Sequence, residues 1–134
     1  MEIMKGRTIS PGKVEGESLV SNEPIGFYGG IDAKTGIFIE KGHELEGKSV
    51  KGKILVFPCG KGSTVGSYII YGLAKNNQAP LAIVNKETET IVATGAILAG
   101  IPCIDRIPVE KISTGDRLTV DATAGTVSMI KKGQ

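Results

Sequence analysis

The first third and the tail of the chain alternate apolar with polar residues, a period typical of strands with one buried face. This alternation predicts strands over residues 4–9, 13–21 and 36–40, separated by turns rich in glycine and proline. Near the end, residues 117–121 and 126–130 alternate in the same way around a short turn and predict a hairpin.

The middle of the chain has a different pattern, because two continuous apolar runs flank a segment with helical periodicity. The runs at residues 53–57 and 80–85 predict buried strands, and residues 63–75 between them predict a helix. Strand, helix and strand in this order form a right-handed βαβ unit. A second helix over residues 88–100 precedes another strand at 101–104. We therefore expect an α/β fold with a mixed, β-rich core and about two main helices.

Composition narrows the classes of function. The 134 residues predict a single domain over 1–134, and the net charge of +2 comes from interspersed charges without a long basic block. The chain has only six aromatic residues, namely three tyrosines and three phenylalanines, and no tryptophan. With few aromatic residues and no basic block, nucleic-acid binding is disfavoured. No apolar run is long enough to cross a bilayer, so we expect no membrane partner and a cytoplasmic location.

Cys59 and Cys103 are the only cysteines, and their spacing matches no zinc or iron–sulfur motif. Two thiols cannot hold an iron–sulfur cluster by themselves, so we predict no metal site within this chain. In a cytoplasmic protein we expect both to be reduced thiols.

The segment that joins the first apolar run to the helix carries the strongest chemical signal. Residues 60–64 read GKGST, so Ser63 follows a glycine-rich turn and meets the start of a helix. Backbone N–H groups and the helix dipole attract anions at such a place. The residues predicted to bind a small anionic substrate are Gly60, Lys61, Gly62, Thr64 and Ser67. A structural interpretation stays open, in which Ser63 only caps the helix.

Two familiar motifs do not fit this loop. A Walker P-loop places Gly-Lys-Ser/Thr at its end, whereas this loop reads Gly-Lys-Gly-Ser. A hydrolase nucleophile elbow needs Gly-x-Ser-x-Gly, and that pattern is missing around Ser63. His43 is the only histidine, and a Ser–His pair would need the two side chains to meet in space. Nucleotide hydrolysis and hydrolase chemistry are therefore disfavoured.

Other polar residues are weaker candidates. Gly29, Gly30 and Asp32 could form a second ordered loop, although Gly-Gly-x-Asp is also an ordinary turn signal. Three basic residues would bind phosphate or carboxylate if the fold brought them together, namely Arg7, Lys13 and Arg106.

Longer stretches of sequence resemble a known family. They are residues 27–36 (FYGGIDAKTG), 42–47 (GHELEG) and 52–63 (GKILVFPCGKGS), followed by residues 79–85, 91–97 and 100–102. Together they cover most of the chain, and they resemble the small subunit of the aconitase X dehydratases. Two positions depart from the family's pattern, which are Ala33, where proline is common, and Cys59 before the glycine-rich turn.

The resemblance implies a swivelling β/β/α domain of the aconitase type that is one part of a split enzyme. In such an enzyme the large subunit carries a [4Fe–4S] cluster, and the small subunit supplies a serine as proton acceptor. Ser63 lies at the position of that serine. The resemblance thus implies a hydro-lyase that is active only in a heterodimer or larger assembly with the large subunit.

The implied reaction is the dehydration of (R)-5-phosphomevalonate to trans-anhydromevalonate 5-phosphate, a step in the archaeal mevalonate pathway to isoprenoids. Related aconitase X enzymes dehydrate cis-3-hydroxy-L-proline, which is the alternative substrate. A non-catalytic anion-binding swivel module is a third interpretation, and activity that depends on the partner would exclude it.

Overall fold

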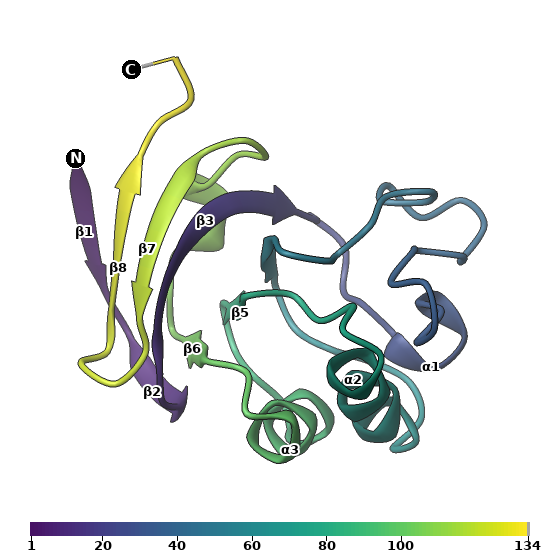
Figure 1. Cartoon of the computed structure of the whole chain (residues 1–134). Helices are drawn as coiled ribbons and strands as arrows, with labels where there is room; N and C mark the ends of the chain where they lie inside the picture. Colours follow the sequence, from purple (N-terminus) through teal and green to yellow (C-terminus); the bar gives the residue numbers. More distant parts are fainter. Residues whose placement is uncertain (134) are drawn as a thin grey trace.

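A strongly curved mixed sheet is the main feature of the computed structural model, which describes residues 1–133 (Figure 1). Within these residues the sheet has eight strands in the order β1-β8-β7-β3-β4-β5-β6-β2. The strands are β1 (Glu2–Lys5), β2 (Arg7–Ser10), β3 (Lys13–Val20), β4 (Ile54–Phe57), β5 (Ala82–Asn85), β6 (Cys103–Asp105), β7 (Arg117–Asp121) and β8 (Thr126–Ile130). The helices are α1 (Phe27–Gly30), α2 (Gly66–Lys75), α3 (Thr90–Ala99) and the short 3-10 helix η1 (Val109–Lys111). The predicted α/β fold with a β-rich core and two main helices is confirmed.

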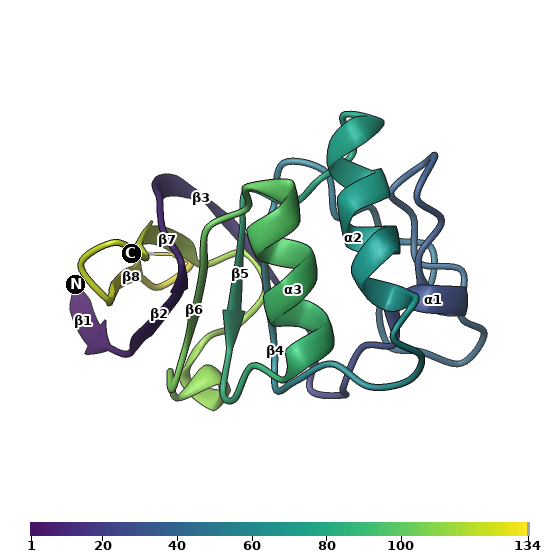
Figure 2. The ribbon, with the colours of Figure 1, turned by 90° about the horizontal axis from the view of Figure 1, so that it is seen from below.

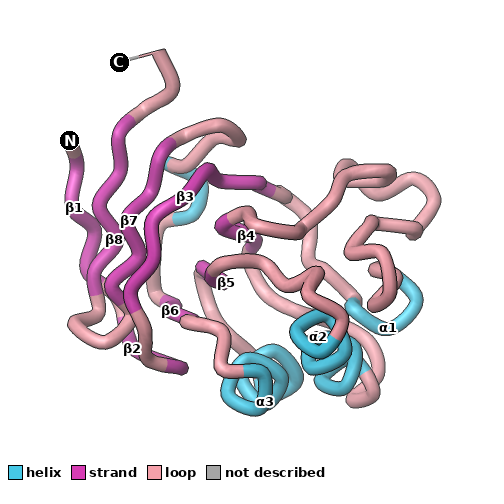
Figure 3. Tube along the Cα trace, viewed as in Figure 1, coloured by secondary structure: helices cyan, strands magenta, loops and turns pink. Residues whose placement is uncertain are grey.

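Strand β3 joins the two halves of the sheet, because its two ends have different neighbours. Its first part, Lys13–Glu17, pairs antiparallel with β7, and its last part, Ser18–Val20, pairs parallel with β4. Strands β4, β5 and β6 continue the parallel half. In Figure 3 the sheet bends at β3, with β7 and β8 on one side of this strand and β4 and β5 on the other. The carboxyl ends of β3 to β6 therefore lie at one edge of the sheet, which is where parallel sheets bind ligands.

Gly6 closes the sheet on itself. Strands β1 and β2 are the first and last in the strand order, yet only Gly6 separates them in the chain. The two outermost strands of the sheet therefore meet at this glycine. The Gly6 N–H donates to the carbonyl of Gly125, with 2.8 Å between N and O. A side chain at Gly6 would overlap the carbonyl oxygen of Asp105. The single strand predicted over residues 4–9 is therefore divided at this glycine.

Helices α2 and α3 lie side by side on one face of the parallel half (Figure 2). Ile70 and Leu73 of α2 and Val92 of α3 are fully buried in the core beneath them. The helices approach closely at Gly95, where an added Cβ would lie 2.8 Å from the Cβ of Ile70. None of the helices within residues 1–133 is long and apolar enough to span a membrane.

The segment from Ile31 to Val50 departs from the prediction. Residues 36–40 do not form a strand, and their pairing is limited to isolated bridges of Ile37 with Ser49 and of Phe38 with Ile31. Glycines with left-handed φ angles recur at positions 36, 42 and 47 and turn the chain before a ladder can extend. The alternation of apolar residues instead reflects packing of single side chains, such as Phe38, into the core.

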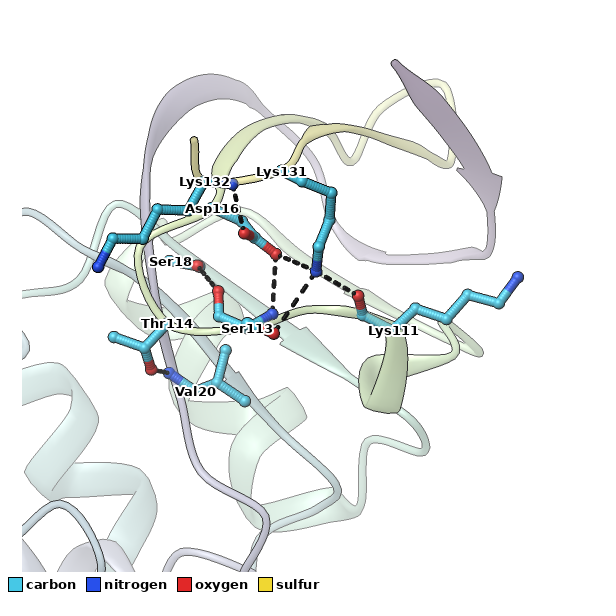
Figure 4. Close-up of polar contacts among 8 residues, drawn as sticks. All are labelled: Ser18, Val20, Lys111, Ser113, Thr114, Asp116, Lys131 and Lys132. Atoms are coloured by element: carbon cyan, nitrogen blue, oxygen red, sulfur yellow. Dashed lines mark hydrogen bonds and ion pairs between the residues drawn. The ribbon is translucent and has the colours of Figure 1, made fainter. Parts of the chain in front are cut away.

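A buried carboxylate holds the tail of the chain against the sheet (Figure 4). Asp116 accepts hydrogen bonds from the Ser113 N–H at 2.8 Å, the Lys132 N–H at 2.9 Å and the Lys131 ammonium at 2.8 Å. Burial by itself would raise the pKa of Asp116, but these three donors hold that pKa below its usual range. The network is therefore structural, and it links residues 113–116 to residues 131–132.

Candidate functional site

Ser63 lies in the loop between β4 and α2, with its side chain exposed to solvent. Its Oγ accepts a hydrogen bond from the Val65 N–H at 3.1 Å, and its carbonyl accepts one from the Gly66 N–H at 2.9 Å. These bonds form a turn before the helix, so α2 begins at Gly66 rather than at the predicted residue 63. Ser63 thus caps this turn, while its hydroxyl stays accessible.

Backbone hydrogen bonds fix the loop at its first residues. The Ile25 N–H donates to the Cys59 carbonyl at 3.1 Å, and the Lys61 N–H donates to the Ile25 carbonyl at 3.0 Å. Ile25 and Gly60 therefore form a parallel bridge, which ties the loop to the segment that follows β3. The loop leaves the sheet from a defined position.

Position 60 needs a glycine because the Glu89 side chain, which no sequence motif singles out, lies against it. The Glu89 carboxylate accepts from the N–H groups of Ile91 at 2.8 Å and Val92 at 3.0 Å, and so caps the first turn of α3. A side chain at Gly60 would overlap this carboxylate and would lie 2.6 Å from Cγ2 of Val92. Glutamate is not among the usual capping residues, so no motif around residue 89 pointed to this contact.

Consecutive backbone N–H groups of the loop are free to bind an anion. Those of Gly62, Ser63 and Thr64 have no acceptor within residues 1–133. Gly62 has a left-handed φ of 88°, and successive N–H groups beside such a residue form a concave anion site. Lys61 adds an exposed ammonium that makes no salt bridge in the described part of the chain. The loop therefore suits a carboxylate or phosphate group.

Ser67 has a different environment from the other predicted binding residues. It is buried, and its hydroxyl donates to the carbonyl of Ile91 at 2.7 Å, which joins α2 to α3. Ser67 and Thr64 both line a groove between the two helices. Gly60, Lys61, Gly62 and Thr64 lie together in the loop, and their contact with substrate, like that of Ser67, stays a prediction.

The three basic residues considered above do not come together. Arg7 makes a bidentate ion pair with the buried carboxylate of Asp105, with 3.0 Å from Nε to Oδ1 and 2.8 Å from Nη2 to Oδ2. The same carboxylate accepts a hydrogen bond from the Thr88 N–H. Lys13 begins β3 and therefore lies at the opposite edge of the sheet from the Ser63 loop. Arg106 follows β6 and lines a separate surface hollow. No shared phosphate site forms from these three.

His43 and Asp32 have structural environments. The buried His43 ring stacks on Phe38, and its Nδ1 accepts from the Leu45 N–H at 3.1 Å. Asp32 accepts from the N–H of Lys34 at 2.8 Å and closes an ordinary turn.

Metal ligands do not gather in the described part of the chain. Within residues 1–133 there is no group of three or more His, Cys, Asp or Glu side chains that could hold a metal ion. Cys59 and Cys103 are both free thiols. Burial raises the pKa of the Cys103 thiol to about 12, so this sulfur is a protonated core atom at neutral pH.

The sequence matches one known family. The family model described as aconitase X swivel domain matches residues 3–129. A relative from Thermococcus kodakarensis, named phosphomevalonate dehydratase small subunit, is 53% identical and is matched over 98% of this chain and 98% of its own length. A relative of the same name from Methanocaldococcus jannaschii is 56% identical over 96% of this chain and 98% of its own length.

The fold also matches a solved structure, described as the crystal structure of Thermococcus kodakaraensis aconitase X in its holo-form. The TM-score is 0.96 at 53% sequence identity, and the match covers 98% of this chain and 100% of that chain. Sequence and backbone therefore lead to the same family.

Proposed function

The chain belongs to the aconitase X swivel-domain family, and from that premise we propose that it is the small subunit of a two-subunit phosphomevalonate dehydratase. The observation that carries the proposal is the likeness to relatives of that name over nearly the whole length of both chains. The reaction is then the loss of water from (R)-5-phosphomevalonate, which gives trans-anhydromevalonate 5-phosphate. Such an enzyme is a hydro-lyase of the mevalonate pathway.

We propose that a large partner subunit holds a [4Fe–4S] cluster and completes the site. The described residues offer no ligand set for a cluster, so the chemistry assigned to this chain is that of the Ser63 loop. An exposed loop needs a second surface to exclude water during the reaction. We expect the assembly in the cytoplasm, where the free thiols of Cys59 and Cys103 stay reduced.

In this proposal Ser63 accepts the proton. Dehydration breaks a C–H bond and the C–O bond of the neighbouring hydroxyl-bearing carbon, forms a C=C bond between the two carbons, and releases the hydroxyl group together with one proton as water. The Ser63 side chain is exposed, so a substrate held by the partner can reach it. A neutral hydroxyl is a weak base, and its deprotonated form needs stabilisation. The free N–H groups of the loop and the Lys61 ammonium supply positive potential for that purpose.

The test is turnover by the small subunit reconstituted under anaerobic conditions with the cluster-bearing large subunit. We expect Ser63→Ala to lower kcat by about 100-fold or more, which is the usual contribution of a positioned proton acceptor. Ser49→Ala is a matched control, because Ser49 is also exposed and its Oγ likewise accepts from the N–H two residues later, that of Lys51. This control should turn over like the wild type.

Two substrates and one binding measurement make the outcomes distinct. Phosphomevalonate should be dehydrated and cis-3-hydroxy-L-proline should not, and the reverse result would replace the substrate. Ser63→Ala should bind the large subunit as the wild type does. Wild-type turnover by Ser63→Ala in the assembled enzyme would refute the role of Ser63, and absence of turnover in any assembly would refute the dehydratase itself.

A further inference from the structure

The aromatic residues of this chain divide sharply between interior and surface. All three phenylalanines are buried, and all three tyrosines, Tyr28, Tyr68 and Tyr71, are exposed. Two of these tyrosines, Tyr68 and Tyr71, lie on α2. Val65, the residue just before α2, is also exposed and precedes Tyr68 by three residues, and its N–H donates to Ser63 Oγ, so an exposed stripe runs from the Ser63 loop along the helix. Tyr68 is 69% exposed. Exposed tyrosines on a helix face are typical of protein interfaces.

A groove runs between this stripe and α3. Its volume is about 340 Å³, and the residues that line it are Thr64, Ser67, Tyr68, Thr90, Ile91, Thr94 and Leu98. Tyr68 and Leu98 also line a second hollow of about 410 Å³ together with Tyr71. We call the two hollows together the α2–α3 groove. Thr90, Thr94 and Leu98 recur every four residues, so one face of α3 forms a wall of the groove.

The lining of the α2–α3 groove carries no charged side chain, although 22% of the residues in the chain are charged. Depletion of charged groups together with exposed tyrosines distinguishes the centre of an interface from ordinary surface. Leu98, 55% exposed, adds a large apolar side chain to the patch. The groove therefore suits an uncharged, apolar segment rather than an anion.

Direct contacts between the two helices hold the walls of the groove in place. The hydroxyl of Ser67 donates to the carbonyl of Ile91 across the two helices, and Gly95 allows their close approach. Beneath the groove, Ile70 and Val92 are fully buried. A surface that is already ordered loses little conformational freedom when a partner binds.

We propose that the α2–α3 groove docks an uncharged, apolar segment of the large subunit, with Tyr68 and Leu98 as its main anchors. This inference rests on the proposed function. We assign the groove to the large subunit because the groove is continuous with the Ser63 loop: Thr64 lines the groove and is the immediate neighbour of Ser63. A partner that brings substrate to the Ser63 hydroxyl also covers the near end of the groove.

The test measures the dissociation constant of the small subunit from the cluster-bearing large subunit, for example by calorimetry. Tyr68→Ala and Leu98→Arg should each raise the Kd by about 30-fold, as expected for a central interface residue. The control is Ile3→Arg, because Ile3 is 59% exposed but lies on β1, away from α2 and α3 in both views (Figures 1 and 2). Its Kd should stay within about threefold of the wild type.

Turnover separates docking from chemistry. At saturating concentrations of the variant small subunit, Leu98→Arg should recover the kcat of the wild type, whereas Ser63→Ala should not. Circular dichroism melting of each isolated variant shows whether it is folded, and the highly exposed Tyr68 provides a second variant if Leu98→Arg unfolds.

The outcomes are distinguishable. Wild-type affinity in both groove variants, or an equal loss in Ile3→Arg, would overturn the groove while the dehydratase proposal stands. A wild-type chain that does not bind the large subunit would instead overturn the proposed function. A purified chain that forms a dimer, dissociated by Leu98→Arg, with unchanged affinity for the large subunit, would assign the groove to a second copy and overturn our proposal.

Discussion

At the scale of single residues, Gly60 is the position near the site that least tolerates a side chain, because Glu89 and Val92 occupy the space that a Cβ would need. We expect Gly60→Ala to lower the free energy of unfolding by about 1–3 kcal/mol, the usual cost of overpacking. The loop must move to accept the methyl group, so kcat of the assembled enzyme should fall as well. Urea denaturation and turnover at saturating large subunit measure the two effects.

A second glycine serves as the control for this substitution. Gly42 has a left-handed φ of 83°, but no atom lies within 4 Å of an added Cβ. Gly42→Ala should therefore lower stability through backbone strain alone and leave kcat unchanged. If Gly60→Ala also left kcat unchanged, close contact with Glu89 would not be what positions the Ser63 loop.

At the scale of an element, α3 depends on its cap. Glu89→Ala removes the acceptor of two N–H groups, those of Ile91 and Val92, and should lower the free energy of unfolding by about 0.5–2 kcal/mol. Glu89→Gln keeps one oxygen acceptor and should lose less. The control is Glu87→Ala, because the exposed Glu87 carboxylate accepts no hydrogen bond within residues 1–133. Equal urea midpoints for the two alanine variants would contradict a capping role for Glu89.

At the scale of the whole molecule, Asp116 connects the tail to the sheet and makes stability depend on pH. Its pKa in the folded state lies below the ordinary value of about 3.9. The carboxylate therefore stabilises the fold above about pH 4, and this contribution is lost as the pH falls through the lower pKa of the folded state. Asp116→Asn should cost about 1–3 kcal/mol at pH 7, since it weakens three hydrogen bonds to a charged group.

The measurement is the free energy of unfolding of wild type and Asp116→Asn in urea from pH 7 to pH 3. The gap between the two proteins should narrow as the pH drops below about 4. A gap that stays constant over this range would mean that the charge on Asp116 contributes nothing to folding.

Local pattern predicted those elements whose residues follow one simple period. The hairpin of residues 117–121 and 126–130 agrees with β7 and β8, and Gly100 ends α3 with a left-handed φ of 70° as a glycine cap does. The strand predicted over residues 36–40 was wrong, because its apolar residues pack singly from a loop. The start of α2 was placed three residues early, since a serine-capped turn and a helix start share the same sequence signal.

The sequence by itself determined the α/β class, the strand–helix–strand unit and the glycine-rich loop around Ser63, because each depends on neighbours within a few residues. Only the tertiary structure decided the closure of the sheet at Gly6, the contact of Gly60 with Glu89 and the separation of Lys13 from the Ser63 loop. The α2–α3 groove likewise exists only once two helices pack against each other. These features join residues far apart in the chain, and pairing across such distances is set by the packing of the whole sheet rather than by local propensity.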